Sequence, residues 1–171
     1  MKKLLSIFTV IFAIIMLQSC KQASPVDYNN SIITQQQAIV YKIDNLKKAI
    51  DSYSFLPADE AIKGMNASYD SLMFQIDSGL NFISHLEDFD GDNSLKDAAN
   101  TLFTSYKSIV ESDYKQVIEL YKIPDQYFKT QDQQQLDSLL AISNKKLEDA
   151  LNAFVEVHTK FADKNNLTIE N

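Results

Sequence analysis

The stretch SIITQQQAIVYKIDNLKKAIDSY, residues 31–53, decides the fold class of this chain. Its bulky residues recur at alternating spacings of four and three, a period that places them on one face of an α-helix. The members of this stripe are Ile32, Gln36, Ile39, Ile43, Leu46, Ile50 and Tyr53. The sequence therefore predicts a long amphipathic helix, which ends before Pro57 because the residue preceding a proline is pushed out of the α region.

Three further stripes of the same period follow. One runs through Ile62, Met65, Tyr69, Leu72, Ile76, Ile83 and Leu86. Gly79 occupies the position of this stripe between Ile76 and Ile83, where the missing side chain allows a neighbouring backbone to approach closely. The next follows the break at residues 90–93 and runs through Leu95, Ala99, Leu102, Tyr106, Ile109 or Val110, Val117 and Tyr121. Ser94 and Asp97 resemble a capping box at its start, and Pro124 closes it. The last stripe follows a polar stretch at residues 130–135 and contains Leu136, Leu140, Leu147, Leu151, Phe154 and Phe161.

The fold class follows from these stripes and from the scarcity of turn residues. Three glycines and three prolines are too few for a many-stranded fold. Short connections make neighbouring helices antiparallel, so the sequence predicts an all-α, up-down-up-down four-helix bundle over residues 31–171.

The first twenty residues have a different character from the rest of the chain. A basic start at Lys2 and Lys3 precedes an apolar run over residues 4–17, which is typical of a secretory signal peptide, here residues 1–19. The run is short for a helix that spans a bilayer, which disfavours the alternative of an uncleaved membrane helix.

The residues Leu17-Gln18-Ser19-Cys20 resemble the bacterial lipobox. This resemblance implies cleavage before Cys20 and acyl chains, such as palmitate, on that residue. Cys20 is the one cysteine of the chain, so no partner is present for a disulfide. More than one acyl chain makes membrane attachment stable, and residues 20–30 are predicted to form a tether with a reach of about 30 Å.

The lipoprotein resemblance also bears on location. Lys21 stands where an aspartate would resemble an inner-membrane retention signal, which favours the outer membrane, with the periplasmic face preferred to the cell surface. The lipobox, the lysine-only basic residues and the layout of the stripes together look like short helical lipoproteins of Bacteroidota whose function is uncharacterised. That likeness implies no binding or catalytic residues.

The charge balance excludes one large class of partner. Beyond residue 20 the chain has 14 lysines against 23 acidic residues, and it contains no arginine. Without a basic surface or the bidentate guanidinium group, nucleic acid is not an expected partner.

The acidic turn at residues 88–94 partly resembles a calcium loop. Asp88, Asp90 and Asp92 alternate as in an EF-hand, but Asn93 stands where that loop needs glycine and Ala99 where it needs a bidentate glutamate. A solvated turn between helices is the favoured interpretation, and these three aspartates are only weak candidates for a cation site.

His85 and His158 are the two histidines of the chain. Neither belongs to the Glu-x-x-His pattern of di-iron bundles, so they too are weak metal candidates, and no cofactor is expected. A hydrogen-bonded histidine at the edge of the core is the simpler role for His158.

The stripes leave few residues for chemistry or recognition. No thiol, elbow serine or paired acid is arranged for catalysis, so an enzyme is not expected. Tyr114, Tyr127 and Phe128 fit the stripes least and are the candidate contact patch.

The sequence thus favours a lipid-anchored, non-enzymatic binding or structural protein of the cell envelope, with an unknown protein or envelope component as partner. The alternative is a small-ligand or metal-binding bundle with an internal cavity, for which Gly79, Gln36 and His158 are the candidate seam residues.

Overall fold

A computed structural model describes residues 23–168, and over these residues the chain forms helices and no strand, which confirms the all-α prediction. The elements are α2 (Pro25–Asp51), a 3-10 turn η2 (Ser52–Phe55), α3 (Ala58–His85), α4 (Ser94–Ile109), a π-helical turn η3 (Val110–Tyr114), α5 (Lys115–Tyr121) and α6 (Thr130–Lys164). Because α4, η3 and α5 follow without a break, the described chain makes four rods. The predicted signal peptide, residues 1–19, and the lipobox with Cys20 lie outside the described residues.

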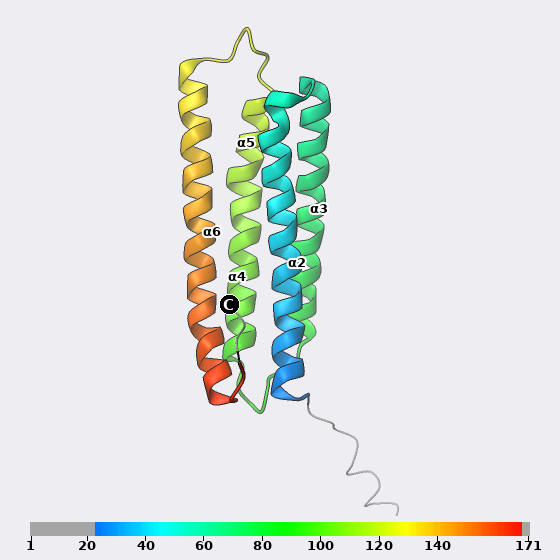
Figure 1. The fold of residues 1–171 in the computed structure, drawn as a ribbon, viewed down its shortest axis with the longest axis vertical. Coiled ribbons are helices and arrows are strands. Elements are labelled where there is room, and N and C mark those ends of the chain that lie inside the picture. Colours follow the sequence, from blue (N-terminus) through cyan, green and yellow to red (C-terminus); the bar gives the residue numbers. More distant parts are fainter. Residues whose placement is uncertain (1–22, 169–171) are drawn as a thin grey trace, which may run out of the picture.

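The four rods stand side by side, and successive rods run in opposite directions (Figure 1). Helix α2 packs on α3, α4 packs on α6, and α3 joins the two pairs through its contacts with α4. We call the end formed by residues 52–57 and 122–129 the distal end. The opposite end, which contains the start of α2 and the turn at residues 86–93, is the proximal end.

Helix α2 begins earlier than the sequence suggested. Residues 25–30 are helical, so the prediction of an irregular tether up to residue 30 is wrong. Ser24 caps the helix by accepting a hydrogen bond from the backbone N–H of Asp27 at 3.1 Å, and Pro25 suits the first turn because its missing N–H is not needed there. Tyr28 is buried against Phe89 and Phe161, and this packing fixes the first turns of the helix.

The predicted stripes form the core. In α2 and α3 the buried residues include Ile32, Ile39, Ile43, Leu46, Ile50, Met65, Leu72, Ile76 and Ile83, all of them stripe members. Gly79 is buried as well, but side chains and not a neighbouring backbone approach it: an added Cβ atom would lie 3.1 Å from Ile39 Cδ1 and 3.2 Å from Phe103 Cδ2. The expectation of a close backbone contact at Gly79 is therefore wrong.

The third rod contains the least regular part of the bundle. The sequence left open whether Ile109 or Val110 faces the core, and both are buried because the π-helical turn η3 inserts an extra residue into the helical repeat. The predicted capping box is not formed, since no side chain caps α4 at its N-cap residue, Asn93. Instead, Asp92 Oδ1 accepts a hydrogen bond from the Ser94 N–H at 3.0 Å.

Helix α6 also extends beyond its predicted stripe. The polar stretch at residues 130–135 forms its first turns, which are capped by a hydrogen bond from the Lys129 N–H to Asp132 Oδ2 at 2.8 Å. Leu136, Leu147, Phe154 and Phe161 are buried as the stripe predicts. Of the helices in residues 23–168, none combines the length and the apolar character needed to cross a membrane.

Candidate functional site

A cavity of about 290 Å³ opens at the distal end, between η2, the end of α5 and the start of α6. Its lining includes three aromatic side chains, Tyr53, Tyr121 and Phe128, and three polar ones, Ser54, Asp125 and Gln133. Aliphatic side chains from α5, α6 and the connection between them complete the lining. The cavity thus combines aromatic and aliphatic side chains with polar groups, and more of its surface is polar than apolar.

Two tyrosines bring the separate connections at the distal end together. The rings of Tyr53, in η2, and Tyr121, the last residue of α5, have centroids 4.5 Å apart and are tilted by 46°. The Tyr53 hydroxyl also donates to the Tyr121 carbonyl oxygen at 3.5 Å. This carbonyl lies at the end of a helix, where backbone acceptors lack partners within the helix, so the tyrosine contact also supports the end of α5.

The surroundings of this cavity are acidic. Burial raises the pKa of Tyr121, and the negative charges near it, including those of Asp51 and Asp137, raise it further. Asp125 is the single charged residue of the lining, which includes no lysine or histidine. The cavity therefore places three aromatic side chains beside acidic residues.

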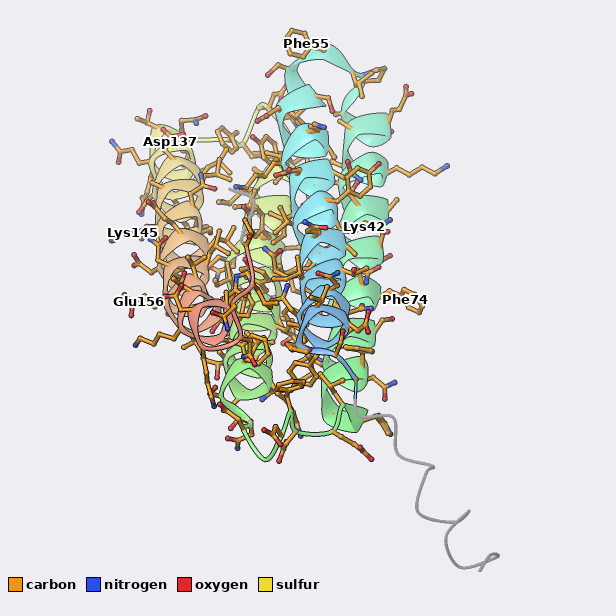
Figure 2. All side chains as sticks on the ribbon, turned by 60° about the horizontal axis from the view of Figure 1, so that its bottom comes forward. Lys42, Phe55, Phe74, Asp137, Lys145 and Glu156 are labelled. Atoms are coloured by element: carbon orange, nitrogen blue, oxygen red, sulfur yellow. The ribbon has the colours of Figure 1, made fainter. Side chains whose placement is uncertain are left out.

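Large apolar side chains surround the cavity at the same end. Phe55, Leu56 and Tyr127 leave 85%, 42% and 64% of their surfaces exposed. Figure 2 shows the Phe55 side chain beyond the ends of α2 and α3. We call these three residues the distal apolar tip. Exposed aromatic side chains of this kind are common anchors in protein interfaces.

Of the predicted contact patch, Tyr114 is wrong, whereas contact through Tyr127 and Phe128 stays a prediction. Tyr127 is exposed and Phe128 half-buried, and both lie at the distal end. Tyr114 is buried in the core, because the π-helical turn rotates it inward. The sequence reasoning missed Phe55 and Leu56, although two apolar residues directly before Pro57, at a helix end, were a usable signal.

A second polar group lies at the π-helical turn. Asp113 is buried there, and its Oδ2 accepts hydrogen bonds from Lys146 Nζ at 2.7 Å and from Ser143 Oγ at 3.4 Å. Burial raises the pKa of Asp113, but the hydrogen bonds from Lys146, Ser112 and Ser143 outweigh it and hold the pKa below its ordinary value. The carboxylate is thus charged and fully engaged, as in a structural ion pair.

The acidic turn at the proximal end is held by lysines. Asp88 pairs with Lys96 at 2.8 Å and Asp92 with Lys164 at 2.6 Å, while Asp90 is exposed. The hydrogen bonds from Lys164 and Ser94 hold the pKa of Asp92 well below its usual range. No group of three residues suited to hold a metal occurs in the part of the chain that the structure describes, so these aspartates and the two histidines are not brought together.

The two histidines occupy different surroundings. His158 is buried on α6, where its Nε2 donates to Asn29 Oδ1 at 2.7 Å and its ring stacks on Phe154. Burial lowers its pKa. His85, the last residue of α3, is exposed, and its Nδ1 lies 2.8 Å from the Asn81 carbonyl oxygen.

The positions suggested for an internal cavity are filled by protein side chains. Gly79 faces Ile39 and Phe103, Gln36 lies beside the buried Tyr106, and His158 is engaged by Asn29. The hypothesis that these three residues line a ligand cavity is therefore wrong. The distal cavity is a separate concave site, and none of these three residues lines it.

Comparison with known proteins gave no guide to this site. No family model matches the chain, and no match was found among curated proteins or among solved structures.

Proposed function

We propose that this chain is a lipid-anchored, non-enzymatic binding protein of the bacterial cell envelope, held at the outer membrane, which presents its distal end to an envelope partner. The observation that carries the proposal is the distal apolar tip, Phe55, Leu56 and Tyr127, beside the aromatic cavity. Three of the eight exposed large apolar side chains of the described residues lie at this end, and exposed apolar side chains at one end of a bundle favour contact with a partner.

The orientation follows from the proposed anchor. Cys20 precedes the start of α2 by five residues, so an acyl group on that cysteine would keep the proximal end near the membrane. The 27 residues of α2 then separate the two ends by about 40 Å. The tip would thus stand clear of the lipid headgroups and be accessible to a partner.

The non-enzymatic role is supported by the chemistry of the cavity. Its polar residues are Ser54, Asp125, Gln133 and two tyrosines, and in the described residues no hydrogen bond pairs the Ser54 hydroxyl with the Asp125 carboxylate as nucleophile and base. Such a lining suits binding and orientation of a group better than bond cleavage.

Membrane anchoring is tested by the substitution Cys20→Ser. Serine removes the thiol that the acyl chains require. We expect the variant to retain its signal peptide, whose apolar run over residues 4–17 would hold it at the inner membrane, and therefore to be lost from the outer-membrane fraction. Ser19→Ala, which preserves a small residue before the cleavage point, is the control and should fractionate as the parent does. Normal processing and sedimentation of Cys20→Ser would exclude the anchor.

Partner contact at the distal end is tested by photo-crosslinking in intact cells. A crosslinking amino acid replaces Tyr127 in one variant and Phe74 in another, because both are exposed aromatic residues, 64% and 74%, but Phe74 lies on the side of α3 (Figure 2). We expect a discrete adduct from position 127 that is absent from position 74 and is lost when Phe55→Ser is added. Identical adducts from both positions, or none from position 127, would exclude a contact at the distal end.

A further inference from the structure

We propose that the distal cavity binds an alkylammonium group, such as the headgroup of a choline-type amine or the end of a lysine side chain. This inference rests on the proposed function, because it names the group that a partner of the distal end would insert. Three independent properties of the cavity support it: its aromatic faces, its charge and its size.

The aromatic faces come from three different segments. Tyr53 belongs to η2, Tyr121 to the end of α5, and Phe128 to the connection before α6. The centroids of the first two rings are 4.5 Å apart and the rings are tilted by 46°, so they are in contact and a ligand would meet them from the cavity side and not between them. The negative face of an aromatic ring attracts a cation within about 6 Å, and a quaternary ammonium group is the ligand that several such rings recognise best.

The charge of the cavity has the sign that an ammonium group needs. Asp125 contributes a carboxylate to the lining, and Asp51 and Asp137 act on the Tyr121 ring from nearby. Of the two lysines on the connection, Lys122 is paired with Glu119 at 2.7 Å and Lys129 is not part of the lining. A ligand with a carboxylate or phosphate at this position would be repelled, because like charges in a partly desolvated site are costly.

The size limits the ligand to a single headgroup. A volume of about 290 Å³ is at the lower end of the range of about 300–1,000 Å³ that is usual for small-molecule sites. The hydroxyl of Ser54 lines the cavity and can meet a hydroxyl or amide next to the ammonium group, while the amide of Gln133 already donates to Asp137 Oδ1 at 2.8 Å and offers its oxygen. The cavity therefore fits one alkylammonium end with a short polar stem.

The test is calorimetric titration of the purified full-length chain in a non-ionic detergent, since zwitterionic detergents with ammonium headgroups would compete. Choline is compared with its neutral isostere 3,3-dimethyl-1-butanol, and Nα-acetyl-lysine amide with Nα-acetyl-norleucine amide. We expect at least one cation to bind about tenfold more tightly than its neutral isostere. If choline binds more tightly, the group is a choline-type headgroup; if Nα-acetyl-lysine amide binds more tightly, the group is the end of a lysine side chain.

Three variants locate the binding. Asp125→Asn removes the charge at the cavity and Phe128→Leu removes an aromatic face, and each should weaken cation binding several-fold. Asp70→Asn makes the same charge change on an exposed part of α3 and should leave binding unchanged. Circular dichroism of each variant separates a loss of binding from a loss of folding.

The outcomes are distinct from those of the crosslinking experiment. Equal binding of cation and isostere, no binding of either cation, or full binding by the folded Asp125→Asn variant would overturn the inference. If crosslinking through position 127 persists in that case, the proposed contact at the distal end stands and only its ammonium ligand is wrong.

Discussion

Lys146 Nζ, on α6, lies 2.7 Å from Asp113 Oδ2, on the π-helical turn η3, and this ion pair joins two segments that are 33 residues apart in the sequence. The Asp113 side chain is 7% exposed and the Lys146 side chain 49% exposed, so the lysine extends from the surface and its ammonium group reaches the buried carboxylate. A π-helical turn widens the helix and weakens its regular hydrogen bonding. The ion pair between Asp113 and Lys146 offsets part of this weakening, because it holds the turn against α6.

The substitution Lys146→Met should lower the free energy of unfolding by about 1–2 kcal/mol, because it leaves a buried carboxylate without its cationic partner. Methionine keeps an unbranched apolar stem, which limits the loss of packing. Lys145→Met is the matched control, since Lys145 pairs with Asp149 in an exposed position and should change the free energy by at most about 0.5 kcal/mol. Urea unfolding of both variants gives the comparison, and equal losses would show that the ion pair has no special role.

The hydroxyl of Tyr114 is buried and finds no hydrogen-bond partner among the described residues. Burial raises its pKa to about 12, with a further contribution from the charges of Asp113 and Asp44. Tyr114→Phe removes an unsatisfied polar atom and keeps the ring, so we expect the variant to be as stable as the parent or more stable by about 1 kcal/mol. A clear loss of stability on thermal unfolding would mean that the hydroxyl has a partner such as a buried water.

The two glycines of α3 should respond oppositely to alanine. Gly64 is exposed and an added Cβ atom would have no neighbour within 4 Å, so Gly64→Ala should stabilise the bundle by about 0.5–1 kcal/mol through helix propensity. At Gly79 the new atom would crowd Ile39 and the ring of the fully buried Phe103, and this cost outweighs the same gain in propensity.

We therefore expect Gly79→Ala to destabilise the fold by about 1 kcal/mol. Chemical unfolding of the two variants side by side is the measurement. Stabilisation of both by similar amounts would show that the core around Gly79 has room for a methyl group.

His158 makes stability depend on pH. Burial lowers its pKa below the ordinary value of 6.5, so the unfolded chain binds a proton more readily than the folded one. The contribution of the neutral histidine is fully present above pH 6.5 and is lost as the pH falls below that value. We expect the free energy of unfolding to fall as the pH is lowered below about 6.5 and His158→Gln to flatten this slope. His85→Gln, at the exposed histidine, is the comparison, and an equal slope in the two variants would exclude His158 as the group responsible.

The sequence by itself determined the all-α class, the core stripes and the breaks between the rods. Spacings of four and three place Ile39, Ile43 and Leu46 on one helical face in any context, because the period of the α-helix is local. Pro57 and the turn at residues 90–93 are equally local signals, since proline and glycine restrict or release the backbone wherever they occur. Because a stripe is defined by local spacing, Tyr127 could also be recognised from the sequence as a residue that fits no stripe, and it is exposed.

The tertiary structure decided which residues leave the regular pattern. Tyr114 was expected at the surface, but one extra residue in the π-helical turn rotates it into the core, and a turn of this kind is stabilised by the distant Lys146. The same holds for residues 25–30, which are helical because Tyr28 packs against Phe89 and Phe161. The distal cavity unites Tyr53 with Tyr121 from segments 68 residues apart. Such contacts depend on how whole helices pack, and a local period in the sequence carries no information about them.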